Sequence, residues 1–172
     1  MKIAAAVAAA DKNLETNPMK IIPATREHVP EIVAMLVEFA DFEKLSQYCE
    51  VTEERLSNAL FGETKTAEAL VVTDGRTLAG YAVFYPSFST FRGQSGFYLE
   101  DLYIRSDFRG LGLGEKMLGE IARIGRERGY ERIDFTVLDW NEAAMTFYRK
   151  LGAVSDESDI HFKFTDDAFR TL

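Results

Sequence analysis

The chain has 172 residues, of which 47% are hydrophobic and 28% are charged, so it is large enough for one domain with a substantial core. Its net charge of −8 argues against nucleic acid or an anionic membrane surface as the main partner and suits a cationic small molecule. The single Cys49 excludes an intramolecular disulfide, and two distant histidines, His28 and His161, provide no metal-ligand spacing. No apolar run approaches the length of a membrane-spanning helix.

The first 18 residues are expected to form a loose extension before a single domain at 19–172. Lys2 and the alanine-rich run to Ala10 weakly resemble a secretory signal. However, that run is short and the acidic Asp11 follows it, so an extension is the favoured interpretation.

The first half of the chain alternates between strand and helix signals. We expect a strand at 20–23 and then a helix capped by Thr25. An irregular acidic segment follows at 41–50, and Thr52 caps a second short helix that ends at Leu60. Strands at 69–73 and 78–85 are expected to join through a hairpin turn at Asp74-Gly75, and Pro86 is expected to end the second strand.

In the second half, a loop at 87–96 is expected to precede a strand at 97–104. A helix then runs to about Arg128, with Gly129 at its C-terminus, and a strand covers 132–138. Asn141 caps a short helix that ends at Gly152. Val154 and residues 160–164 supply the last strand material. The β-α-α-β-β-β-α-β-α-β order predicts an α/β (mixed α+β) domain with one mixed central sheet and helices on both faces.

The most informative segment is Arg109-Gly110-Leu111-Gly112-Leu113-Gly114, between the expected strand and helix. A glycine-rich turn at a helix N-terminus exposes backbone N–H groups beside the positive end of the helix dipole, which is an arrangement that binds phosphate. Arg109 adds a cationic group. The Walker pattern is absent because Met117 follows Lys116, and the dinucleotide pattern also fails because Met117 occupies the place of its third glycine.

What remains, R-x-x-G-x-G, resembles the acetyl-CoA pyrophosphate loop of the GCN5-related N-acetyltransferase (GNAT) superfamily. Two later segments, 139–142 (D-W-N-E) and 147–153 (F-Y-R-K-L-G-A), have that superfamily's order and spacing. Together with Y-L-E-D at 98–101, they look like the diamine (spermidine/spermine) acetyltransferase branch, with its bacterial and thialysine-acetylating relatives. The resemblance covers roughly Met19 to Phe164 and implies the GNAT acyl-CoA N-acyltransferase fold.

The resemblance implies acetyl-CoA as co-substrate, and the cysteine and histidine content predicts no metal. The loop would hold the pyrophosphate, the strand before it would offer its backbone to the pantetheine arm, and Asn141 would both cap its helix and contact CoA. The cofactor-binding residues implied are Leu102, Tyr103, Ile104, Arg109, Gly110, Leu111, Gly112, Leu113, Gly114, Glu115, Asn141 and Ala144.

For catalysis, no covalent nucleophile is evident, so direct transfer is expected. The resemblance implies Tyr148 as the general acid, although a core aromatic would explain it too. Glu100 would accept the proton of the amine through water. Asp101, its neighbour on a strand, is expected to point to the opposite face and to be structural. The substrate-binding residues implied are Glu43, Glu100, Asp134, Phe135 and Thr136; a solvated charge would equally explain Glu43.

The sequence thus predicts an acetyl-CoA-dependent N-acetyltransferase acting on a small primary amine, a diamine, polyamine or lysine analogue. The branch has a Trp shortly after the Gly152-Ala153 pair that this chain lacks, so the identity of the amine stays open. The alternatives are a protein N-terminal or lysine acetyltransferase, a non-catalytic acyl-CoA-binding domain and, least favoured, a nucleotide-binding protein. A homodimer is expected from the resemblance alone, and a cytoplasmic location from acetyl-CoA chemistry.

Overall fold

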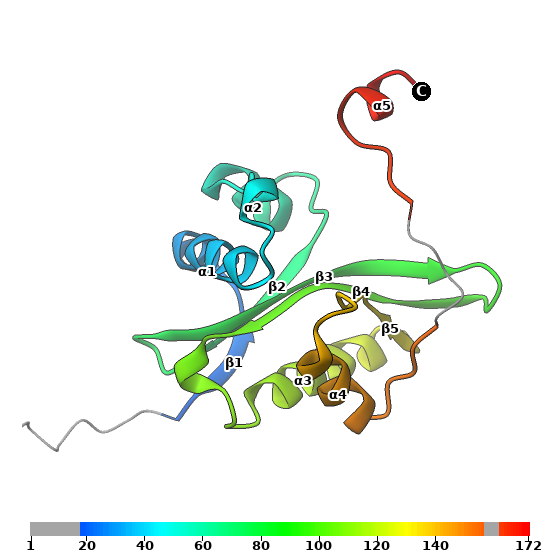
Figure 1. Cartoon of the computed structure of the whole chain (residues 1–172). Coiled ribbons are helices and arrows are strands. Elements are labelled where there is room, and N and C mark those ends of the chain that lie inside the picture. The colour runs from blue at the N-terminus through cyan, green and yellow to red at the C-terminus, as the bar shows by residue number, and fades with distance from the viewer. Residues whose placement is uncertain (1–17, 157–161) are drawn as a thin grey trace, which may run out of the picture. The chain divides into compact units, whose positions relative to one another are not determined.

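The computed structural model describes residues 18–156 and 162–172 (Figure 1). The described residues form two compact units, divided between Thr136 and Val137. In chain order the helices and strands are β1 (Lys20–Pro23), α1 (Val29–Phe42), α2 (Glu53–Phe61), β2 (Glu68–Thr73), β3 (Leu78–Ser89), β4 (Gln94–Ile104), α3 (Leu113–Glu127), β5 (Arg132–Asp134), α4 (Glu142–Lys150) and α5 (Asp166–Arg170).

The first unit is a mixed sheet with helices on both faces, as predicted. Among the described residues, five strands form one sheet in the order β1-β2-β3-β4-β5. The first four strands pair antiparallel, and β5 pairs with β4 in parallel. In Figure 1, α1 and α2 cover one face of the sheet and α3 runs along the other.

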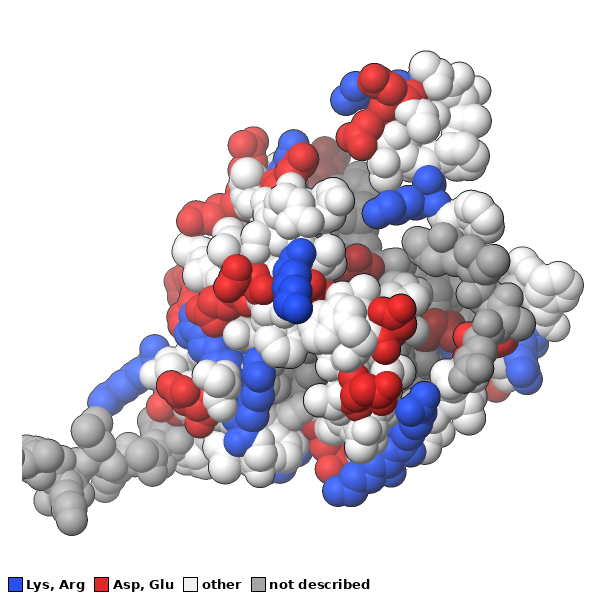
Figure 2. All heavy atoms as spheres, viewed as in Figure 1, with Lys and Arg blue, Asp and Glu red and all other residues white. Residues whose placement is uncertain are grey.

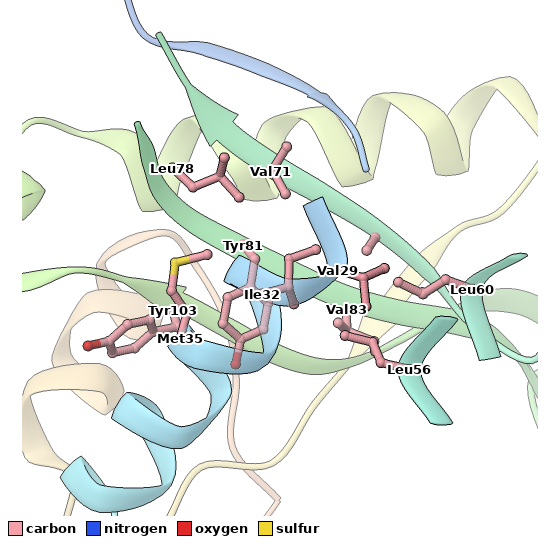
Figure 3. Packing of buried hydrophobic residues seen from close by; sticks show 11 residues of the cluster. Val29, Ile32, Met35, Leu56, Leu60, Val71, Leu78, Tyr81, Val83 and Tyr103 are labelled. Atoms are coloured by element: carbon pink, nitrogen blue, oxygen red, sulfur yellow. The ribbon is translucent and has the colours of Figure 1, made fainter. Parts of the chain in front are cut away.

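Two apolar clusters hold these layers together. The cluster on the α1–α2 face includes Ile32, Met35 and Tyr81, and all three side chains are fully buried (Figure 3). The cluster on the α3 face includes Phe97 and Met117, which are also fully buried. Burying a large apolar side chain stabilises a fold by roughly 1.5–3 kcal/mol, so the two clusters fix which face each helix covers.

The long hairpin of β3 and β4 corrects one expectation. Residues 87–96 were expected to form a loop, and Pro86 to end the strand, but β3 continues to Ser89 and pairs with β4 as far as Gln94. The last β2–β3 pair is Glu68 with Phe84, so Pro86 lies where β3 has no β2 partner. Proline is tolerated at such an edge because its missing N–H leaves no ladder hydrogen bond unmade.

β5 is shorter than expected and covers 132–134 rather than 132–138. It approaches β4 closely at Gly96, where an added Cβ would lie 2.6 Å from the Arg132 carbonyl oxygen. A glycine at this position therefore allows the parallel pairing of Gly96 with Arg132.

The C-terminal expectation is also corrected in part. Val154 and residues 162–164 are not in a strand, whereas residues 160 and 161 lie outside the described residues. A short helix, α5, follows instead; Thr165 is its N-cap, and Asp166 and Asp167 lie in its first turn. Acidic residues at this position favour a helix N-terminus, a local signal that the sequence interpretation missed.

Candidate active site

The glycine-rich loop leads into a helix N-terminus, as predicted. Gly110 and Gly112 have positive φ angles of 76° and 70°, and Gly112 is the N-cap of α3 without any side-chain capping hydrogen bond. An added Cβ at either glycine would meet no atom within 4 Å. Glycine is therefore required here by the left-handed backbone and not by packing. No N-cap side chain bonds the first N–H groups of the 15-residue helix α3, and such groups can bind an anion.

Arg109 is anchored at the start of this loop. Its Nε donates to the carbonyl oxygen of Ile104 over 2.8 Å. Its guanidinium carbon lies 5.3 Å from the centroid of the Phe42 ring and 5.6 Å from that of Tyr103. The terminal guanidinium nitrogens make no hydrogen bond to the residues that the structure describes. The guanidinium group is therefore held in place by Nε while its two terminal nitrogens can still donate to a phosphate.

A β-bulge in β4 determines on which face of the sheet Glu100 and Asp101 lie. Val83 on β3 pairs with Asp101, and the next residue, Phe84, pairs with Leu99, so Glu100 is the extra residue of the bulge. The hydroxyl of Tyr85 donates to Glu100 Oε2 over 3.4 Å. Tyr85 lies two residues after Val83 on β3, so the two side chains point to the same face. Val83 packs in the cluster on the α1–α2 face, and Tyr85 therefore lies on that face too.

Asp101 therefore lies on the same face as Glu100, which corrects the expectation that these two neighbours point to opposite faces. Asp101 pairs with Val83 across the sheet and lies two residues before Tyr103 on β4, so it shares a face with both. Val83 and Tyr103 pack in the α1–α2 cluster. Strict alternation fails because a bulge places two residues of one strand opposite one residue of the other.

Asp101 and Glu43 form an acidic pair at this place. Burial, and then the charges of Glu100 and Glu43, raise the pKa of Asp101 to about 7. Glu43 directly follows α1, and burial raises its pKa as well. A carboxyl that titrates near neutral pH can both accept and release a proton under working conditions. The sequence interpretation expected Asp101 to be structural and to lie on the opposite face, because no local pattern marks the bulge.

Further polar groups line the same face. Tyr85 and Tyr98 stack with ring centroids 5.3 Å apart, and the Tyr98 hydroxyl donates to Thr136 Oγ1 over 3.4 Å. Asp134, paired with Tyr98 in the sheet, is held by an ion pair with Arg132. Of the three expected substrate residues of this segment, Phe135 packs in the cluster on the α3 face instead.

The β5-facing edge of β4 opens toward its end. β5 pairs with β4 only from Gly96 to Tyr98, so Leu102, Tyr103 and Ile104 have no β5 partner among the described residues. Their side chains pack on the two faces of the sheet, with Tyr103 on one face and Leu102 and Ile104 on the other. The β5-facing backbone groups of these three residues therefore have no strand partner among the described residues.

The second unit carries the remaining predicted residues. Asn141 is the N-cap of α4 as predicted, and its Oδ1 accepts from the N–H of Ala144 over 3.1 Å. The rings of Phe147 and Tyr148 pack with centroids 5.0 Å apart. After α4 ends, Gly152 adopts a φ of 92°. Tyr148 lies seven residues after Asn141, which puts it on the same side of the helix.

The described residues contain no group of three or more His, Cys, Asp or Glu side chains placed to hold a metal ion. None of their helices is long and apolar enough to cross a membrane.

Comparison with known proteins decides the family. The model of the Acetyltransferase (GNAT) family matches residues 33–153. The chain belongs to this family. Members of this family use acetyl-CoA as co-substrate, and this chain is an acetyl-CoA-dependent N-acetyltransferase.

Individual relatives extend this finding. The GNAT chain is 35% identical over 152 residues to a thialysine N-epsilon-acetyltransferase of Bos taurus, with 82% of this chain and 89% of that protein covered. It is 29% identical over 137 residues to spermidine/spermine N(1)-acetyltransferase-like protein 1 of Homo sapiens, with 76% of this chain but 20% of that protein covered. The fold matches an integron cassette protein of V. cholerae with a TM-score of 0.73 at 21% identity, over 89% of this chain and 96% of that one.

Proposed function

We propose that this enzyme transfers the acetyl group of acetyl-CoA directly to a primary amine of a small molecule, and that the amine belongs to a diamine, a polyamine or a lysine analogue. The observation that carries the proposal is the β4 bulge, which brings Glu100 and Asp101 to one face, where Glu43 interacts with Asp101. Such a group of carboxylates suits a cationic acceptor. The thialysine N-epsilon-acetyltransferase relatives support a lysine analogue in particular.

Acetyl-CoA binds, in this proposal, along the loop and the open edge of β4. The N–H groups at the start of α3 and the Arg109 guanidinium take the pyrophosphate. The backbone from Leu102 to Ile104 takes the pantetheine arm, and Asn141 and Ala144 contribute from α4. The family match at 33–153 crosses the boundary between the two units, which supports residues 19–172 as one catalytic domain.

The chemistry needs a neutral amine, because an amine with a pKa of about 10 is almost fully protonated at neutral pH. Glu100 accepts that proton through water, and Asp101 is a second candidate because its pKa is raised to about 7. The amine nitrogen attacks the thioester carbonyl, a C–N bond forms and the C–S bond breaks. Tyr148 donates its phenolic proton to the departing thiolate, the nitrogen releases its second proton to solvent as the amide forms, and Tyr148 is reprotonated from solvent.

Acceptor recognition rests on charge. Glu43 and Asp101 hold the cationic groups of the amine, and Asp134 and Thr136 border the same face. Figure 2 shows Asp and Glu side chains scattered among the basic ones, and the net charge of the chain is −8, which favours a small cation over an acidic protein target. A homodimer and a cytoplasmic location complete the proposal; both rest on family resemblance and on where acetyl-CoA is used.

The test is a thiol-release assay with purified protein, acetyl-CoA and a panel of amines. The panel contains thialysine, lysine, putrescine, spermidine, spermine and a basic peptide. Saturable turnover with one of the small amines is the expected result. Turnover with the peptide alone would make the enzyme a protein acetyltransferase. Acetyl-CoA binding without turnover on any acceptor would favour a non-catalytic acyl-CoA-binding domain.

A further inference from the structure

Tyr81 is a buried polar residue with no role in the chemistry described above. It lies on β3 at the centre of the α1–α2 cluster, and its side chain is fully buried. Figure 3 shows its ring between the sheet and α1, among Ile32 and Met35. Its hydroxyl oxygen has no hydrogen-bond partner among the described residues. Buried hydroxyls are nearly always paired, so this one calls for a partner.

The surroundings of the hydroxyl are acidic. Tyr81 pairs across the sheet with Tyr103, and Val83, two residues on, pairs with Asp101, so Tyr81 and Asp101 are diagonal neighbours on one face. Burial raises the pKa of Tyr81, and Asp101 is the charge that adds most to this effect. Tyr103, Glu43 and Cys49 act in the same direction.

No hydrogen bond from the described residues reaches the Asp101 carboxylate, and the charges that act on it, those of Glu100 and Glu43, are both negative. Glu100 belongs to β4 itself, and Glu43 belongs to the segment after α1. The other titratable groups that act on Tyr81 are Tyr103 and Cys49. A neutral O–H donor is the group that stabilises an ionised carboxylate in such a place. Two polar side chains that are neighbours on one face but share no direct hydrogen bond can be linked by one bridging water.

We propose that Tyr81 is a positioning residue for acetyl transfer: its hydroxyl donates, across one water molecule, to the Asp101 carboxylate and stabilises the ionised form that binds and deprotonates the acceptor amine. This inference rests on the proposed function. It adds a residue from β3, outside every sequence motif, to the set that governs the protonation of the acceptor.

The test is the substitution Tyr81→Phe, which removes the hydroxyl and keeps the ring in its packing. Loss of the donor destabilises ionised Asp101, so the acidic limb of the kcat/KM profile should move to higher pH by about 0.5–1 unit. The matched control is Tyr130→Phe, because Tyr130 packs against Phe97 on the opposite face. The control profile should coincide with the wild-type profile. A Tyr81→Phe profile that also coincides with the wild-type profile would overturn the inference.

A second readout needs no turnover. Carbon-13 NMR titration of the aspartate carboxyls, with the Asp101 signal assigned from its loss in Asp101→Asn, should give a higher pKa for Asp101 in Tyr81→Phe than in the wild type. An unchanged titration would refute the inference even if the enzyme is active. A shifted titration in a protein that acetylates no amine would uphold the Tyr81–Asp101 link and refute the proposed function instead.

Discussion

Glu100 and Asp101 are adjacent on β4 and yet lie on the same face of the sheet, because Glu100 is the extra residue of a β-bulge opposite Val83 and Phe84. The bulge gives two carboxylates different environments at one place. Asp101 is half-buried with a pKa raised to about 7, whereas Glu100 is exposed and accepts a hydrogen bond from Tyr85. Two carboxylates in unlike environments can divide the binding and the proton transfer between them.

The stability of the fold should depend on the protonation of Asp101. Its folded-state pKa of about 7 lies above its ordinary value of 3.8, so the folded protein holds a proton that the unfolded chain has released between these values. The stabilising effect is complete below about pH 4 and is lost as the pH rises through about 7.

At high pH the folded protein must hold Asp101 ionised in an unfavourable environment, and Asp101→Asn removes this cost. The substitution should therefore raise the free energy of unfolding by on the order of 1–3 kcal/mol at about pH 8, and much less at about pH 4. Urea unfolding at the two pH values measures the difference. An equal effect at both would mean that folding does not raise the pKa of Asp101.

A glycine-to-alanine substitution should have opposite effects on stability at the N-cap of α3 and inside that helix. Gly112→Ala places a Cβ at φ 70°, which should cost about 1 kcal/mol in stability and raise the KM for acetyl-CoA. The control is Gly119→Ala, inside the same helix, where an added Cβ meets no atom within 4 Å. This control should stabilise the protein by up to about 1 kcal/mol without changing the KM. Thermal melts and steady-state kinetics separate the two effects, and an unchanged KM in Gly112→Ala would argue against the loop as the pyrophosphate site.

Glu43 should affect acceptor binding more than chemistry. Glu43→Gln removes one carboxylate next to Asp101, so the KM for a diamine should rise about tenfold, corresponding to roughly 1.4 kcal/mol, with kcat little changed. Glu63→Gln, an exposed position after α2, is the control. If the two variants have the same KM for the diamine, Glu43 is a solvated charge, which is the other interpretation that its sequence allowed.

Tyr148 should act in the chemical step. Tyr148→Phe removes the proposed proton donor, so kcat should fall by about 10²-fold or more while the dissociation constant of acetyl-CoA stays the same. Tyr130→Phe serves again as the control. Calorimetry and thiol release together make the distinction, and full activity in Tyr148→Phe would assign the ring to packing against Phe147.

Local signals explain most of what the sequence could predict. Thr52 and Asn141 cap their helices as expected, through bonds to the N–H groups of Arg55 and Ala144. Each cap depends only on residues three positions apart, so the pattern can be found in sequence. The glycine-rich loop is equally local, and it begins α3 as predicted.

Cross-strand register explains what the sequence could not predict. The position of Asp101 depends on the bulge between two strands, and the continuation of β3 past Pro86 depends on where β2 stops pairing. Neither is encoded in one stretch of chain. In the sequence Tyr81 is an ordinary strand aromatic, and only the fold reveals that its hydroxyl is buried without a partner among the described residues and that Asp101 raises its pKa.

The most direct test of the account compares acetyl transfer to thialysine by the wild-type enzyme and by the double variant Glu100→Gln/Asp101→Asn, with acetyl-CoA binding measured by calorimetry on both. The account predicts turnover by the wild type, a loss of about 10²-fold or more in kcat/KM in the double variant, and equal acetyl-CoA affinity. Wild-type-like turnover by the double variant, or no turnover by a wild type that binds acetyl-CoA, would contradict it.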